Sequence, residues 1–153
     1  VDDLVRLAHE EAQHSLQDLR EVSWRVYPIA LDQGGLHTAL EAVAERSSVP
    51  VRLFYELPGP RPDPATETVA YFVVSEAVTN AIKHGAPEGI DITVYRDNSW
   101  LVVSVLDDGS GGAQPTGTGL SGLARRVAAA DGEFTVDSPL GGPTVVSARL
   151  PCG

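Results

Sequence analysis

One run of the sequence combines a carboxylate, an amide and two basic groups at spacings that a helix brings onto one face. Glu76, Asn80 and Lys83-His84 follow one another at intervals of four and then three or four residues, and such residues are neighbours on a helix surface. The amide oxygen of Asn80 suits Mg²⁺, which prefers oxygen ligands. The Glu76 carboxylate can act as a base or orient a bound water, and the Lys83 ammonium can neutralise phosphate oxygens.

The same helix, expected over residues 65–83, is apolar on two sides, which is typical of a buried helix. Polar groups on a buried helix are costly unless something satisfies them. The run therefore predicts a cleft that a metal–phosphate complex fills. The alternative is an internal ion pair between Glu76 and Lys83, with Asn80 acting as a cap.

A second run places a carboxylate at the end of an apolar strand. Asp107 follows residues 102–106, and its carboxylate can accept a hydrogen bond from an exocyclic amine such as that of adenine. Gly109 and Gly111 follow, and because glycine has no Cβ, they would let the backbone approach a flat ring. Taken alone, this run is also compatible with a hairpin or a surface turn.

Further glycines precede the next expected helix. Gly117-Thr118-Gly119 leads into Leu120, and the free N–H groups at a helix N-terminus are a ready anion site. A purine at one end and phosphates at the other is the arrangement that ATP requires. The chain has neither a P-loop nor a strand leading into a dinucleotide-binding glycine motif.

The elements expected around these runs alternate between helices and strands. Apolar periodicity and turn residues predict helices at 4–26, 36–44, 65–83 and 120–130, and strands at 49–57, 90–95, 100–106, 133–136 and 144–150. Gly34-Gly35 is expected to break the chain between the first two helices. The sum predicts an α+β fold, a two-layer α/β sandwich entered through an N-terminal helix.

Composition limits the class of protein. A length of 153 residues suits one domain, and the net charge of −10 disfavours nucleic acid as a partner, because backbone binding needs clustered cations. Cys152 is the only cysteine, which fits a reducing cytosol. No apolar stretch approaches the roughly 20 residues that span a bilayer, and Asp2, Asp3 and Arg6 interrupt any secretory signal. We expect a soluble, cytoplasmic domain, or the cytosolic part of a membrane-anchored sensor.

The chain resembles the ATP-binding catalytic domain of sensor histidine kinases, of the GHKL group that includes DNA gyrase. The resemblance rests on four motifs that match the N box, two glycine boxes and the closing segment: Glu76-x-x-x-Asn80-Ala81-x-Lys83-His84, Asp107-x-Gly109-x-Gly111, Gly117-x-Gly119-Leu120-x-Gly122-Leu123 and Gly141-Gly142-Pro143-Thr144. It implies a mixed, largely antiparallel sheet packed on helices. It also implies ATP and Mg²⁺ as cofactors, with Asn80 as the metal ligand, Asp107 as the adenine reader and Glu76 as the residue that assists phosphoryl transfer.

The remaining nucleotide contacts implied by the resemblance come from the same motifs. They are Lys83, His84, Gly109, Gly111, Gly117, Thr118, Gly119, Leu120 and Thr144. The short segment between Gly111 and Gly117 and the N-terminal helix resemble the NarL-partnered, DesK-type subfamily. That implies a NarL-type response regulator as a partner and a homodimer in the full-length kinase. Residues 1–33 would then be the C-terminal part of the dimerisation and phosphotransfer region, and residues 34–153 the catalytic domain.

The phosphoacceptor histidine is expected to lie outside the chain. His9 precedes Glu10 but sits on what matches the second dimerisation helix, whereas the family's acceptor occupies the first; His14 and His37 have no better context. The chain is thus expected to bind ATP without phosphorylating itself. Two alternatives remain open: an anti-sigma-type serine kinase with the same nucleotide boxes, which the N-terminal helix disfavours, and a nucleotide-sensing interaction module without transfer activity, which Glu76 and Asn80 disfavour.

Overall fold

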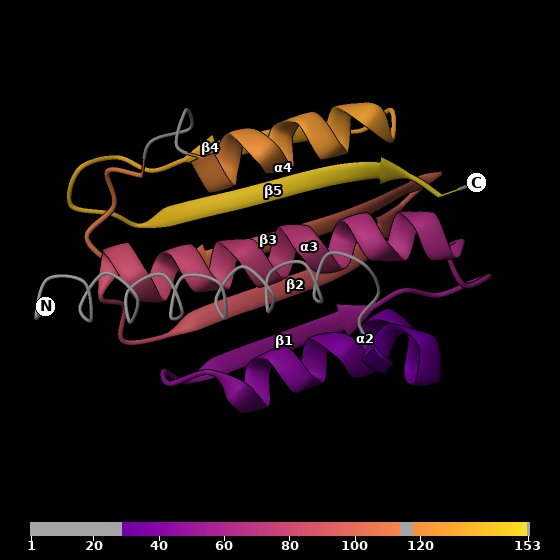
Figure 1. Cartoon of the computed structure of the whole chain (residues 1–153), viewed down its shortest axis with the longest axis horizontal. Coiled ribbons are helices and arrows are strands. Elements are labelled where there is room, and N and C mark those ends of the chain that lie inside the picture. The colour runs from indigo at the N-terminus through magenta and orange to yellow at the C-terminus, as the bar shows by residue number, and fades with distance from the viewer. Residues whose placement is uncertain (1–28, 114–117, 153) are drawn as a thin grey trace, which may run out of the picture.

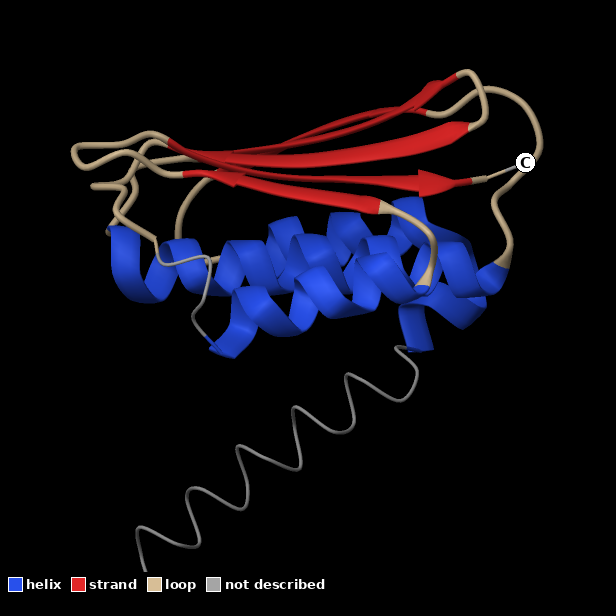
Figure 2. Cartoon of the chain, turned by 90° about the horizontal axis from the view of Figure 1, so that it is seen from above, coloured by secondary structure: helices blue, strands red, loops and turns tan. Residues whose placement is uncertain are grey.

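Helices and strands form two layers in the computed structural model, which describes residues 29–113 and 118–152 (Figure 1). Three helices, the second of them extended by a π-helical turn, lie on one face of a five-stranded sheet (Figure 2). The elements in chain order are α2 (Ile29–Arg46), β1 (Val51–Glu56), α3 (Pro64–Asn80), η1 (Ala81–Gly85), β2 (Ile90–Asp97), β3 (Trp100–Asp107), α4 (Thr118–Ala129), β4 (Glu133–Asp137) and β5 (Thr144–Pro151). The predicted α+β sandwich is confirmed, and the predicted helix at 4–26 lies outside the described residues.

The strand order is β1-β2-β3-β5-β4, with β1 and β2 parallel and every other neighbouring pair antiparallel. Alternate residues of each strand face the helices, as the period-2 pattern predicted. In β2, for example, Ile90, Ile92 and Val94 are buried. The sheet is therefore mixed and largely antiparallel, and its main hydrophobic cluster lies on the helical side.

The central helix is set by its N-terminal residues. Asp63 caps α3 by accepting a hydrogen bond from the Thr66 N–H at 2.9 Å, and Pro64 occupies the first turn, where its missing N–H has no cost. The helix was predicted to run to residue 83. Instead the α-helical part ends at Asn80, and η1 continues it as a π-helical turn to Gly85. Short π turns occur frequently at functional sites.

The buried charge on α3 is not where the sequence pattern suggested. Lys83 and His84 are exposed and Glu76 is half-buried, whereas Glu67, which the motifs did not single out, is buried. Glu67 accepts hydrogen bonds from the Leu36 N–H at 3.2 Å and from the Arg61 guanidinium at 2.9 Å. Buried carboxylates need such partners, so the polar group that α3 buries serves the fold.

This carboxylate secures the break in α2. Gly35 has a φ of 77°, a backbone conformation that separates α2 into two parts. The break predicted at Gly34-Gly35 is present, but it lies within α2, because residues 29–34, which were not predicted to be helical, form the first part of this helix. Glu67 satisfies the Leu36 N–H at the start of the second part, and Arg61 donates to the Leu31 carbonyl oxygen of the first part at 3.5 Å. We call these residues, Leu31, Leu36, Arg61 and Glu67, the α2 clasp.

Replacing Glu67 with alanine is expected to lower the free energy of unfolding by about 2 kcal/mol, because the buried Leu36 N–H loses its acceptor. Chemical denaturation at pH 7 measures this loss. Glu56→Ala, at an exposed position of β1, is the matched control and should change stability by less than about 0.5 kcal/mol. Equal losses in the two variants would contradict the clasp.

Candidate functional site: a cavity between α3, α4 and the sheet

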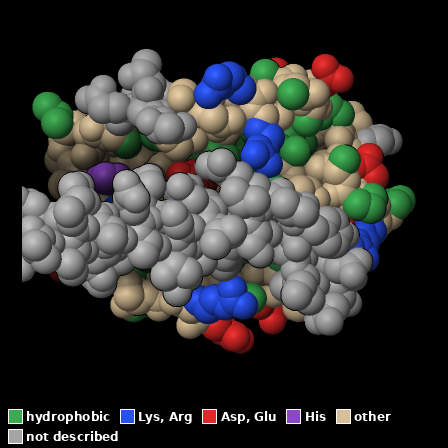
Figure 3. Space-filling model, in the orientation of Figure 1, with side chains coloured by type: hydrophobic (Ala, Val, Ile, Leu, Met, Phe, Trp, Pro, Cys, Tyr) green, Lys and Arg blue, Asp and Glu red, His purple; other side chains and the backbone are tan. Residues whose placement is uncertain are grey.

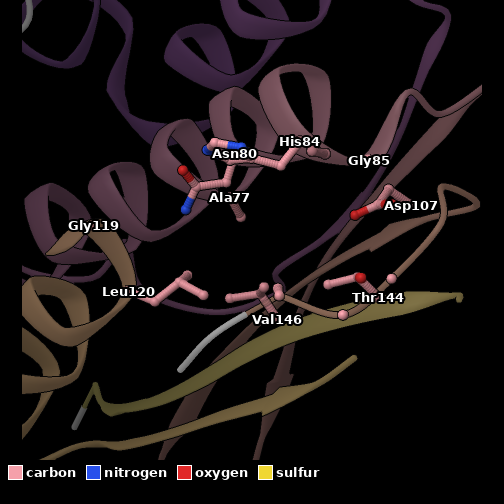
Figure 4. Close-up of a pocket in the computed structure, with 13 residues that line it drawn as sticks. Ala77, Asn80, His84, Gly85, Asp107, Gly119, Leu120, Thr144 and Val146 are labelled. Carbon is pink, nitrogen blue, oxygen red and sulfur yellow. The ribbon is translucent and has the colours of Figure 1, made fainter. Parts of the chain in front are cut away.

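A cavity of about 500 Å³ opens between α3, α4 and the ends of β3 and β5. Its wall consists of Ala77, Asn80, Ala81, His84, Gly85, Asp107, Gly111, Gly112, Ala113, Gly119, Leu120, Thr144 and Val146. Figure 4 shows Asn80 on the helical side, Asp107, Thr144 and Val146 on the sheet side, and Leu120 at the start of α4. Small and apolar side chains with a few polar groups are typical of a ligand pocket.

The sheet register creates the polar pair at one end. Asp107 is the last residue of β3 and lies directly opposite Thr144, the first residue of β5. Cross-strand neighbours of this kind bring their Cβ atoms to about 5 Å. Both side chains face the cavity, and both are buried, with 4% and 7% of their surface exposed. A carboxylate and a hydroxyl thus stand side by side in a largely apolar wall.

Asp107 keeps part of its hydrogen-bonding capacity free. Its Oδ1 accepts a hydrogen bond from the Gly109 N–H at 2.9 Å, and within the described residues its Oδ2 has no partner. Burial raises the pKa of Asp107, the Gly109 N–H opposes this shift, and the nearby Asp108 carboxylate adds to it. A desolvated carboxylate with a free oxygen is a strong acceptor for a ligand N–H group.

Asp108, the next residue, bonds to the protein backbone and does not line the cavity. Its Oδ1 accepts hydrogen bonds from the Glu88 N–H at 2.7 Å and the Gly89 N–H at 3.1 Å. These two bonds hold the pKa of Asp108 below its ordinary value. The adjacent carboxylates are therefore distinct: Asp107 faces the cavity, and Asp108 fixes the segment between η1 and β2.

The other end of the cavity joins Asn80 to the start of α4. A Cβ on Gly119 would lie 3.4 Å from Asn80 Nδ2 and would collide with Glu76 Oε1. The absence of a side chain at Gly119 therefore lets the first turn of α4 approach Glu76 and Asn80. Within the described residues the Asn80 amide makes no hydrogen bond, so its oxygen is available to a ligand.

The structure shows a reason for the glycines after Asp107 that the sequence did not reveal. They were predicted to make room for a flat ring. A Cβ on Gly109 would instead collide with the Gly85 carbonyl oxygen, and one on Gly111 with the Pro139 carbonyl oxygen. Two backbone segments pack against these glycines, so the missing side chains serve the fold, although Gly111 also lines the cavity.

The structure brings together seven of the predicted site residues in the cavity wall: Asn80, His84, Asp107, Gly111, Gly119, Leu120 and Thr144. Gly109 is buried beside Gly85, Glu76 lies against Gly119, and Lys83 is exposed away from the wall. Thr118 begins α4, and Gly117 lies outside the described residues.

Six wall residues were not predicted as site residues: Ala77, Ala81, Gly85, Gly112, Ala113 and Val146. Helical spacing would have found two of them, because Ala77 and Ala81 share the face of α3 and η1 that carries Asn80 and His84. Strand spacing would likewise have identified Val146, because it lies two residues after Thr144 and therefore on the same face of β5.

Figure 3 shows the helical face, where the visible basic side chains of the described residues lie apart from one another. No group of three or more His, Cys, Asp or Glu residues that could hold a metal ion occurs within residues 29–113 and 118–152. In these two segments no helix has the length and hydropathy needed to cross a membrane.

Solved structures with a similar fold include histidine kinases and an ATP binding domain. The histidine kinase domain of Erythrobacter litoralis EL346 blue-light activated histidine kinase has a TM-score of 0.57 and 19% identity, over 76% of this chain and 58% of that one. Acinetobacter baumannii histidine kinase AdeS has a TM-score of 0.57 and 15% identity, over 94% and 80%. The ATP binding domain of PrrB from Mycobacterium tuberculosis has a TM-score of 0.55 and 24% identity, over 75% and 88%. The fold is thus the α+β fold of GHKL ATPases.

Residues 65–153 match the family of histidine kinase-, DNA gyrase B- and HSP90-like ATPases. The match includes α3, the cavity and every strand after β1. The chain belongs to this family. It spans 58% of the length of the Erythrobacter kinase domain.

Asp107→Asn is expected to stabilise the nucleotide-free protein at neutral pH. The folded-state pKa of Asp107 is raised, so the wild-type carboxylate costs no stability below its ordinary pKa of 3.8 and an increasing amount as the pH rises through the folded pKa. The asparagine carries no charge, and its oxygen can still accept from the Gly109 N–H. Urea denaturation should therefore show that the free energy of unfolding of the variant exceeds that of the wild type by an amount that grows from pH 4 to pH 8. A difference that shrinks with rising pH would contradict the desolvated carboxylate.

Proposed function

We propose that the chain is the catalytic, ATP-binding portion of a two-component sensor histidine kinase. One observation carries the proposal. A single cavity of about 500 Å³ has the Asp107 carboxylate and the Thr144 hydroxyl on one side and, on the other, the Asn80 amide beside the start of α4. This separation suits a nucleotide, whose base and phosphates need different partners. The family match and the fold support ATP as that nucleotide.

Asn80 fits a role as the protein's ligand to Mg²⁺. Its amide oxygen is a hard donor, and the described residues offer no acidic cluster that would cage a metal by itself. Mg²⁺ usually keeps several waters and binds through few protein groups together with substrate phosphates. When bound, it would neutralise charge on the phosphate oxygens. The N-terminal N–H groups of α4 would meet the same phosphates.

Glu76 would be the residue that assists phosphoryl transfer. Its carboxylate lies against Gly119, one helical turn before Asn80. In the proposed reaction a histidine nitrogen attacks the γ-phosphorus, the bond from this phosphorus to the β–γ bridging oxygen breaks, and ADP leaves. Glu76 accepts the proton released from the other ring nitrogen. Catalysis of this kind is mostly positioning and charge neutralisation.

The acceptor histidine, a NarL-type response regulator and a homodimer complete the proposed system. We infer that the acceptor lies on a helix outside the chain, because none of the four histidines, His9, His14, His37 and His84, has the sequence context of the family's acceptor. The protein would then operate in the cytoplasm, where ATP is available.

ATP affinity tests the base-reading end. Isothermal titration calorimetry with Mg²⁺ should detect ATP binding by the wild type and a loss of at least about tenfold in Asp107→Asn, because the amide presents an N–H group where the carboxylate accepts. Asp137→Asn, at an exposed position of β4, is the matched control and should bind as the wild type does. The nucleotide assignment fails if the wild type takes up neither ATP nor ADP.

The metal end is tested by the Mg²⁺ dependence of that affinity. Asn80→Ala is expected to bind ATP more weakly in Mg²⁺ and to respond less to its removal by chelation, because the protein's oxygen ligand is gone. Asn98→Ala, in the exposed turn between β2 and β3, should retain the full dependence. An unchanged Mg²⁺ response in Asn80→Ala would exclude this residue as the ligand.

Phosphoryl transfer is tested with labelled Mg–ATP and a separate fragment bearing the acceptor helix of the parent kinase. We expect acid-labile, base-stable label on the fragment and none on the chain alone. Glu76→Gln should reduce the rate by at least about a hundredfold while ATP affinity changes little. Label on serine would favour the anti-sigma-type kinase, and binding without any label would favour a nucleotide-sensing module.

A further inference from the structure

Ser138 lies outside the cavity wall but bonds to three groups that form it. Its carbonyl oxygen accepts a hydrogen bond from the Gly112 N–H at 3.0 Å, and its hydroxyl oxygen accepts one from the Ala113 N–H at 2.9 Å. The same hydroxyl lies 2.6 Å from Thr144 Oγ1. Gly112, Ala113 and Thr144 all line the cavity. One serine in the β4–β5 turn thus connects two separate parts of the wall.

We propose that Ser138 is a positioning residue that turns the Thr144 hydroxyl into a donor toward the base, and so sets the preference of the cavity for an adenine edge over a guanine edge. The proposal rests on the nucleotide-binding function proposed above. It concerns a residue outside the cavity wall, and it is carried by the hydrogen bonds that Ser138 makes.

Which hydroxyl donates to the other depends on how many of the two hydroxyl protons find an acceptor. A backbone N–H can only donate, so Ala113 occupies one lone pair of Ser138 Oγ. If Ser138 donates to Thr144, the Ser138 proton is used and the Thr144 proton remains for the cavity. If Thr144 donates instead, Ser138 accepts twice and its own proton has no acceptor among the described residues. Without a ligand, each arrangement leaves one hydroxyl proton without an acceptor among the described residues. When a base places an acceptor beside Thr144, only the first arrangement gives both hydroxyl protons an acceptor, and buried polar groups favour full satisfaction.

The consequence for recognition follows from the register of the sheet. Asp107 and Thr144 lie directly opposite each other, so they meet adjacent positions on one edge of a base. The Asp107 carboxylate accepts from an amine, and the Thr144 hydroxyl donates to the neighbouring ring nitrogen. Adenine offers this amine and this acceptor. Guanine offers a carbonyl oxygen and an N–H in their place, and both are mismatched.

The test compares affinities for ATP and GTP in Mg²⁺ by calorimetry. Ser138→Ala should lower the ratio of ATP to GTP affinity roughly tenfold, which is the usual worth of one hydrogen bond to a ligand. Ser138→Thr, which keeps the hydroxyl, should restore the ratio. Ser138→Cys, a weak donor of similar size, replaces the alanine variant if that variant does not fold.

Two further variants show whether Ser138 acts through Thr144. Thr144→Val should lower the ratio by a similar factor, and the double variant Ser138→Ala/Thr144→Val should equal Thr144→Val alone, because the second change removes what the first one positions. Ser147→Ala is the matched control. Ser147 lies on β5, as Thr144 does, but on the face of the sheet away from the helices, and its hydroxyl bonds to Ser104 of β3 at 3.2 Å. Its removal should leave the affinity ratio unchanged.

A readout without nucleotide tests the contact itself. Amide hydrogen exchange at Ala113 should accelerate in Ser138→Ala, because its acceptor is lost, and should stay at the wild-type rate in Thr144→Val. If the wild type binds ATP selectively and Ser138→Ala keeps the wild-type ratio, the inference is overturned while the nucleotide function stands. An additive double variant also overturns it. If the wild type binds neither nucleotide, the proposed function fails and base selection fails with it.

Discussion

The burial of one carboxylate organises the cavity. Asp107 ends β3 on the face of the sheet that the helices cover, and its position there follows from the same alternation that places Val103 and Val105 in the core. A desolvated carboxylate destabilises an apolar wall unless partners compensate for the lost water. The Gly109 N–H supplies one partner, and the structure leaves a place for a second. A ligand that donates a hydrogen bond to Asp107 would therefore compensate for part of the desolvation cost of its carboxylate.

The fold was largely predictable from the sequence because its signals are local. The alternation in β2, the Asp63-Pro64 start of α3 and the Gly34-Gly35 break each depend on a few neighbouring residues, and each is confirmed. The end of α3 was missed by several residues, since the change from α-helical to π-helical bonding at Ala81 leaves no mark in apolar periodicity. The pairing of the parallel strand β1 with β2 also has no local signal.

The site was predictable where one element carries it and not where two segments meet. Asn80 and His84 follow from helical spacing, and Asp107 follows from its place after an apolar strand. The roles of Glu67 and Ser138 depend on contacts with residues 31 and 25 positions away along the chain, respectively. The same holds for Gly109, where a side chain would collide with the carbonyl oxygen of Gly85. A hydrogen bond between distant segments has no periodicity, so no pattern in the sequence announces it.

The glycine segment after Asp107 and the turn before β5 interlock through bare backbone. A side chain on Gly142 would strike the Gly109 carbonyl oxygen, one on Gly111 would strike that of Pro139, and the Gly141 N–H donates to the Ser110 carbonyl oxygen at 2.8 Å. Neither segment keeps its shape without the other. We therefore expect that a chimera which imports one of these segments from a relative needs the other as well, although some thirty residues separate them.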